Sequence, residues 1–70
     1  MEIKYRKLRA KILEVFGTHS AFAKAVDLSE TQLSKKLNGK TAISVKDMYK
    51  WGETLGIEVD DFVDYFVKQS

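Results

Sequence analysis

The most informative part of this 70-residue chain is the stretch HSAFAKAVDLSETQLSKKLNGK, residues 19–40. It predicts two short helices joined by a tight turn. The first runs from about Ser20 to Val26, with Thr18 or Ser20 as its cap. The second starts at Ser29, which has the spacing of a capping box with Gln32. Two helices that cross steeply over so short a turn need small and apolar residues at their contact. The sequence supplies them at Ala23, Val26, Leu28 and Leu33.

The turn between these helices requires a residue that tolerates positive φ. Glycine is usual there, but this chain has Asp27, whose short side chain can bond locally and so tolerates the left-handed conformation. Beyond the turn, Leu33 and Leu37 lie four residues apart and form the inward face of the second helix. We expect Asn38 and Gly39 to end that helix in a left-handed turn.

Another helix is predicted before this stretch, from about Tyr5 to Phe16, with Gly17 at its end. Its apolar stripe consists of Tyr5, Leu8, Ile12 and Val15. Proline is absent from the chain, glycine is sparse and β-branched residues do not alternate. The whole chain therefore reads as helices separated by short turns, without strands.

Two further helices are predicted after the stretch. One begins with a second capping pattern at Ser44 and Asp47 and ends at Gly56. Its buried stripe is expected to contain Val45, Met48, Gly52 and Leu55, with Trp51 beside it. The other lies within IEVDDFVDYFVKQS, residues 57–70, where Asp60 or Asp61 suits the first turn. Together the segments predict an all-α fold, a compact bundle of about five short helices.

Composition excludes several classes of function. Seventy residues form one domain at most, here residues 1–70, with little room for a catalytic cleft. Cysteine is absent, which excludes a disulfide scaffold and a thiolate metal site, and His19 is the single histidine. The charged stretch MEIKYRKLRA, residues 1–10, lacks the apolar run of a secretory signal. We therefore expect a cytoplasmic protein without membrane contact or cofactor that is not an enzyme.

Charge is distributed unevenly along the chain. Residues 1–40 carry nine Lys and Arg against four acids, a net charge of +5, whereas residues 41–70 carry three Lys against six acids, a net charge of −3. Such asymmetry suggests one face for a polyanion and another for a different contact. Ordinary solvated helix faces are the alternative explanation when charge is considered alone.

Residues 19–40 resemble the helix-turn-helix domains of temperate-phage repressors and Cro proteins. More narrowly, FGTHSAFAKAV together with LSETQLSKKLNGK is similar to small Cro-like regulators from phages of Gram-positive bacteria, and the resemblance extends loosely through LGIEVDDF. The pattern departs at Asp27, where glycine is commoner, and at Lys36, where an apolar residue often packs. The resemblance implies a lambda-repressor-like fold and a transcription regulator that acts at a palindromic operator. It also implies a host-cell location at the nucleoid and a second, larger phage repressor that competes for related sites.

In such domains the second helix of the pair lies in the major groove of duplex DNA, while the first crosses the backbone. Carried over by position, the residues that face bases are Glu30, Thr31, Gln32 and Lys35. Gln pairs with adenine, Lys donates to guanine, Glu accepts from cytosine and the Thr methyl contacts thymine. Contacts to the DNA backbone are expected from His19, Ser20, Ser29, Ser34, Asn38 and Lys40.

The last segment contains more apolar residues than one helical stripe can hold, so they either complete the core or pair two chains. A symmetric dimer that reads two half-sites about 34 Å apart doubles the base contacts. We therefore expect a homodimer, with an interface at Val63, Tyr65, Phe66 and Val67. The rival hypothesis is a protein-interaction module on the same scaffold that binds a partner repressor. A net charge of only +2, the acid Glu30 on the reading face and the acidic, apolar tail favour this rival.

Overall fold

The computed structural model describes residues 4–67 and is helical throughout, with no strand in that range. Four α-helices are followed by a short, irregular fifth segment. The helices are α1 (Arg6–Phe16), α2 (His19–Ala25), α3 (Glu30–Leu37) and α4 (Val45–Leu55), and the fifth segment consists of the 3-10 turn η1 (Val59–Asp61) and the π-helix η2 (Val63–Val67). The predicted all-α class is therefore confirmed.

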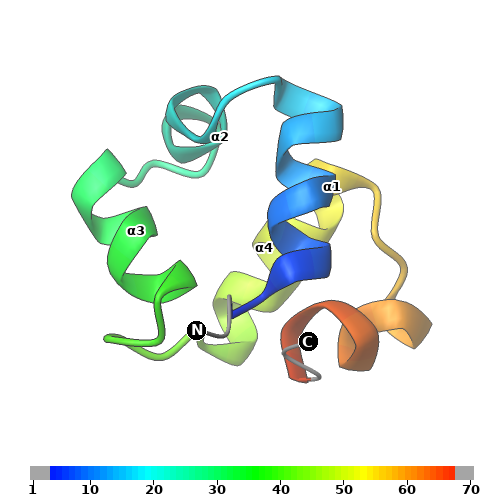
Figure 1. Ribbon diagram of the computed structural model, residues 1–70. Coiled ribbons are helices and arrows are strands. Elements are labelled where there is room, and N and C mark those ends of the chain that lie inside the picture. The colour runs from blue at the N-terminus through cyan, green and yellow to red at the C-terminus, as the bar shows by residue number, and fades with distance from the viewer. Residues whose placement is uncertain (1–3, 68–70) are drawn as a thin grey trace.

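The helices are arranged around α1 and α4, which lie together in the middle of the molecule (Figure 1). On one side α2 packs against α1 and α3 packs against α2, so the pair predicted from residues 19–40 stands at an edge of the molecule. On the other side η2 packs against α1. The C-terminal segment and α3 thus occupy opposite sides of the same central pair.

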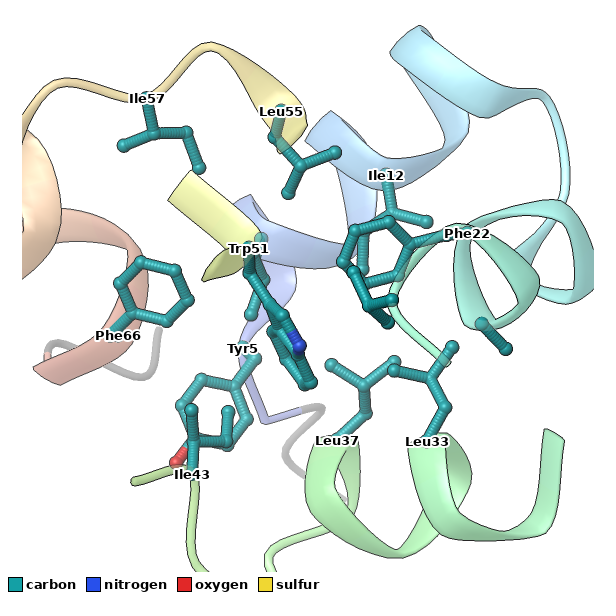
Figure 2. Packing of buried hydrophobic residues seen from close by; sticks show 13 residues of the cluster. Tyr5, Ile12, Phe22, Leu33, Leu37, Ile43, Trp51, Leu55, Ile57 and Phe66 are labelled. Carbon is teal, nitrogen blue, oxygen red and sulfur yellow. The ribbon is translucent and has the colours of Figure 1, made fainter. Parts of the chain in front are cut away.

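The core is built around Trp51 of α4 (Figure 2). The Phe22 ring meets the Trp51 ring edge-on with centroids 5.3 Å apart, and the Phe66 ring lies 6.4 Å from Trp51. Leu33 and Leu37 approach this cluster from α3, as the sequence predicted. Burying each such side chain contributes about 1.5–3 kcal/mol, and this packing positions α3 with its polar face outward.

Helix ends follow local signals in the sequence. The hydroxyl of Ser29 accepts from the Gln32 N–H at 3.1 Å and the Gln32 side chain accepts from the Ser29 N–H at 3.0 Å. Ser44 and Asp47 form the second capping box in the same way. Asp27 has φ 59°, so the left-handed residue predicted for the turn is confirmed. These features depend on residues within four positions of one another, which is why sequence predicted them.

The structure corrects three details of the predicted helices. Thr18, one of the two predicted caps, caps α2 by accepting from the Ala21 N–H at 3.1 Å, so α2 begins at His19, one residue before the predicted start. Val15 is 46% exposed, because Phe16 takes the place beside Phe22 with ring centroids 5.4 Å apart.

The third correction concerns the first turn of α4. Val45 is 64% exposed and does not belong to the buried stripe that was predicted for this helix. The buried positions of α4 are Trp51, Gly52 and Leu55, while Met48 is partly buried. All of these follow the first turn, so α4 enters the core only beyond Val45.

The fifth helix is the least regular part of the structure. Phe62 and Phe66 share one face, as predicted, and their rings meet edge-on at 5.3 Å. However, Phe62 packs directly on Gly52, where a Cβ atom would lie 2.6 Å from the ring. Phe66 is only 3% exposed and belongs to the core, so its predicted place in a dimer interface is wrong. A bulky ring that is buried within one protomer cannot also cover a second chain.

Candidate nucleic-acid interface

The outward face of α3 carries a continuous set of polar side chains. It lies opposite Leu33 and Leu37, which are buried. Together with Lys40 these side chains line an open groove of about 350 Å³. The residues that line this groove, called the α3 groove below, are Glu30, Thr31, Ser34, Lys35, Asn38 and Lys40. The structure thus brings together three of the four residues predicted to read bases and three of the six predicted to contact the backbone.

Gln32 lies outside the α3 groove. It lines a second hollow of about 410 Å³ on the other flank of α3, together with Leu28, Lys35, Lys36, Thr41 and Asp47. Its Oε1 accepts the Ser29 N–H at 3.0 Å as part of the capping box. Bidentate pairing with adenine uses the same oxygen, so the cap and that base contact would share one acceptor. The sequence predicted both a cap and a base contact for Gln32, and in the structure Gln32 forms the cap.

Residues at the start of α2 do not join the α3 groove. Ser20 is exposed, but His19 is partly buried, and its Nε2 has neither solvent contact nor a hydrogen-bond partner among residues 4–67. Burial, together with the nearby positive charge of Arg9, lowers the pKa of His19 below its ordinary value. The ring is thus held in its neutral form, which makes it a poor counter-charge for phosphate.

Arg9 on α1 is a residue beside the candidate site that sequence reasoning missed. Its Nε donates to the Lys4 carbonyl at 2.8 Å, and its Nη2 donates to the Leu37 carbonyl at 3.0 Å and to Asn38 Oδ1 at 2.8 Å. Asn38 Nδ2 in turn donates to Ser34 Oγ at 3.2 Å. Arg9 therefore ties the beginning of α1 to the end of α3. The partners lie 28 and 29 positions apart, so no local pattern marks them.

Lys36 fastens α3 to α4. Its Nζ donates to Asp47 Oδ2 at 3.0 Å and to the Ala42 carbonyl at 3.1 Å. Burial raises the pKa of Asp47, but hydrogen bonds from Lys36 and Ser44 outweigh it, so the pKa lies below its ordinary value. Lys36 occupies the position where the resemblance leads one to expect an apolar residue. The ion pair with Asp47 provides the contact that an apolar side chain would otherwise make.

The charge around the α3 groove is mainly positive. Lys35 and Lys40 line it, and the Lys4 side chain lies across Gly39 at its end, within 2.9 Å of where a Cβ atom would stand. Glu30 is the one acid among the lining residues. The C-terminal segment on the other side of the molecule contains Glu58, Asp60, Asp61 and Asp64. The charge asymmetry of the sequence thus becomes a separation between two sides of the fold.

No group of three or more potential metal ligands occurs within residues 4–67. Over the same residues, every helix is too short or too polar to traverse a lipid bilayer.

Comparison with known proteins adds a family but no activity. A family model described as "Protein of unknown function (DUF739)" matches residues 1–69. No curated protein matches the chain significantly. The family match thus covers the α3 groove, the core and the C-terminal segment.

Proposed function

The chain belongs to the DUF739 family, and we propose that this member is a sequence-specific regulator of transcription that binds duplex DNA through a helix-turn-helix unit formed by α2 and α3. The observation that carries the proposal is the α3 groove. It places exposed polar and cationic side chains on one face of a short helix at the edge of the molecule. A helix presented in this way suits the major groove, which is wide enough to admit it.

The proposed contacts divide along α3. Glu30, Thr31 and Lys35 face base edges in the first turn and a half, where a recognition helix makes most of its base contacts. Backbone contacts come from Ser34, Asn38 and Lys40, which line the same groove, and from the exposed Ser20 and Ser29. Gln32 and His19 are left out of the proposed set, because one forms the cap and the other has a buried Nε2.

The resemblance to Cro-like phage repressors supplies the biological part of the proposal. It favours a lambda-repressor-like domain that represses by occupying a palindromic operator in the host cytoplasm, in competition with a second phage repressor. The fold contributes an all-helical scaffold in which α2 packs on α3. No catalytic or cofactor-dependent step is part of this function.

A palindromic operator calls for a homodimer, and we propose that it forms through the exposed valines of the C-terminal segment. Val63 is 51% exposed and Val67 is 60% exposed, and Val59 continues the same four-residue spacing. Tyr65 is only partly exposed, and Lys7 Nζ lies 4.9 Å from its ring centroid, so Tyr65 borders the interface. Two acidic segments repel each other, so this dimer should tighten when moderate salt screens them.

The test is selection of bound fragments from random-sequence duplex DNA at two salt concentrations. An enriched inverted repeat, with affinity that falls steeply as salt rises, is the expected result. The slope of log affinity against log salt should be about −0.9 for each phosphate neutralised. Weak, sequence-independent binding even at low salt would contradict the proposal.

One observation favours a second candidate, a module that binds a partner repressor. Glu30 places a carboxylate in the α3 groove, where it opposes phosphate. Salt separates the two candidates, because an apolar protein interface responds little to salt whereas phosphate contacts respond strongly. Glu30→Gln sharpens the test: it should strengthen or redirect DNA binding if α3 reads DNA, and weaken binding to a protein partner if the carboxylate is needed there.

A further inference from the structure

We propose that Arg9 is a positioning residue that orients Asn38 and Ser34 so that, together with Lys40, they offer a cationic cluster of hydrogen-bond donors in the α3 groove, which suits a phosphodiester oxygen. The inference rests on the proposed function and assigns the ligand chemistry of one half of its site. It follows from the hydrogen bonds of Arg9 and Asn38 and from the number of donors and acceptors on each side chain.

The first step is the orientation of the Asn38 amide. An arginine guanidinium has five N–H donors and no acceptor. Because Arg9 Nη2 lies 2.8 Å from the Asn38 side chain, the atom that faces it must be the amide oxygen, Oδ1. The amide NH2 therefore points away from Arg9 and toward the groove.

The orientation of Asn38 fixes that of Ser34. Asn38 Nδ2 donates one hydrogen to Ser34 Oγ at 3.2 Å, so the hydroxyl acts as the acceptor in that bond. Within residues 4–67 the Ser34 hydroxyl donates to no protein group, which leaves its hydrogen for a ligand. The second hydrogen of Asn38 Nδ2 is available in the same way. With the Lys40 ammonium, which lines the same groove, these side chains offer several donors and a positive charge.

The donors at Ser34, Asn38 and Lys40 suit a phosphodiester group. Phosphodiester oxygens carry negative charge and accept hydrogen bonds but donate none. A cluster of donors with a positive charge therefore suits the DNA backbone. Glu30 and Thr31, which can accept hydrogen bonds, lie at the other end of α3 and fit base edges. The α3 groove thus combines a donor cluster at Ser34, Asn38 and Lys40 with acceptors in the first turn of α3.

Arg9 itself is not in position to hold the phosphate. Its guanidinium already donates to the Lys4 carbonyl, the Leu37 carbonyl and Asn38 Oδ1, and Arg9 is absent from the residues that line the α3 groove. Its effect on DNA therefore passes through Asn38. This distinguishes a positioning residue from a direct phosphate contact in a measurable way.

A double-mutant cycle tests the positioning role. The variants are Arg9→Lys, Asn38→Ala and their combination, with Arg6→Lys as the control because Arg6 is exposed on the same helix. Affinity for a selected duplex is measured over a range of salt, at a temperature where melting curves show every variant folded. Arg9→Lys keeps the charge but loses the planar fork. It should weaken binding about fivefold, leave the salt slope unchanged and add nothing to Asn38→Ala.

Two results of this cycle would overturn the inference. Additive effects of Arg9→Lys and Asn38→Ala would show that Arg9 does not act through Asn38. A salt slope reduced by about 0.9 in Arg9→Lys would show that Arg9 contacts a phosphate itself.

A polarity reversal gives an independent test. Asn38→Asp keeps an acceptor for Arg9 but removes both donors, so the protein should remain as stable while duplex affinity falls more than roughly tenfold. Thr41→Asp places the same charge in the second hollow and is the matched control. Equal losses in the two variants would show that charge alone is responsible and would contradict the inference.

Failure of the proposed function is recognised separately. If neither the wild-type protein nor Arg6→Lys binds duplex DNA, the proposed function is wrong. The donor cluster at Ser34, Asn38 and Lys40 is then tested with inorganic phosphate. Phosphate should shift the side-chain NH2 signals of Asn38 in the wild-type NMR spectrum and leave them unmoved in Arg9→Lys. The absence of a shift in the wild-type protein would overturn the site itself.

Discussion

The α2–turn–α3 unit and the C-terminal segment are held on the same core by different means. In the first unit each helix starts at a side-chain cap, and α3 buries one face and exposes the other. In the C-terminal segment a 3-10 turn passes into a π-helix, and apolar residues lie both inside the core and on the surface. Local preference and packing agree in α3, whereas packing overrides local preference in the tail.

This contrast bears on the proposed binding of DNA by α3. A helix that reads DNA must present side chains at a defined angle, and a regular, capped helix anchored by Arg9 and Lys36 provides that. The tail must bury Phe62 and Phe66 beside Trp51 within a few residues, and it does so with irregular geometry. The regular helix, α3, thus lies on the side proposed to bind DNA, and the irregular C-terminal segment lies on the side that completes the core.

The largest effect is expected from removing the ring that anchors the tail. Phe66→Ala should reduce the free energy of unfolding by about 3–5 kcal/mol, because it leaves a cavity beside Trp51. Val67→Ala, at a neighbouring position that is exposed in the monomer, should change it by less than about 0.5 kcal/mol when the protein is dilute enough to stay monomeric. Urea denaturation measures both. Similar effects of the two substitutions would show that the tail does not distinguish core from surface positions.

A substitution on α4 tests the close approach of the tail. Gly52→Ala introduces a Cβ that would lie 2.6 Å from the Phe62 ring, so the ring must shift. We expect a loss of about 1–3 kcal/mol in stability from this overpacking. Phe62→Leu in the same chain should recover part of the loss by making room. If Gly52→Ala alone melts at the wild-type temperature, the contact between α4 and the tail is looser than described.

On the α3 side, three substitutions should separate base reading, backbone contact and helix capping. Lys35→Ala should cost about 1–3 kcal/mol of discrimination at one base pair, and Lys40→Ala should weaken binding to all duplexes alike. Gln32→Ala should instead lower thermal stability, through loss of one capping hydrogen bond, and leave sequence preference in place. Binding to a panel of operator variants, together with melting curves, measures these effects. A changed sequence preference in Gln32→Ala would return Gln32 to the reading face.

The smallest effect is expected from acid titration of the contact between α3 and α4. The pKa of Asp47 in the folded chain lies below its ordinary value of 3.8, so the unfolded chain binds the proton more readily. The stabilisation is therefore fully present above pH 3.8 and is lost as the pH falls through the folded pKa. Lys36→Met, which removes the ion-pair partner, should flatten this part of the curve of stability against pH. An unchanged curve would show that the pair does not stabilise the fold.

Several features of the fold and the candidate site followed from residues close together in the chain. The capping boxes at Ser29 and Ser44 and the positive φ of Asp27 depend on atoms within a few positions of each other, so they could be predicted. The polar face of α3 followed from the spacing of Leu33 and Leu37, because a helix that buries those two must expose the opposite side.

Other features arose only when the helices packed. Arg9 reaches Asn38 across 29 positions, and Gly52 admits the Phe62 ring, because of the way α1, α3, α4 and the tail cross. Helical periodicity indicates which face of a helix is buried but not which partner it meets or at what angle. For the same reason Phe66 could not be assigned to core or surface from sequence, since its segment carries apolar residues on more than one face. In the folded chain Phe66 is buried. Folding also brings Arg9, Asn38 and Ser34 into one hydrogen-bonded network.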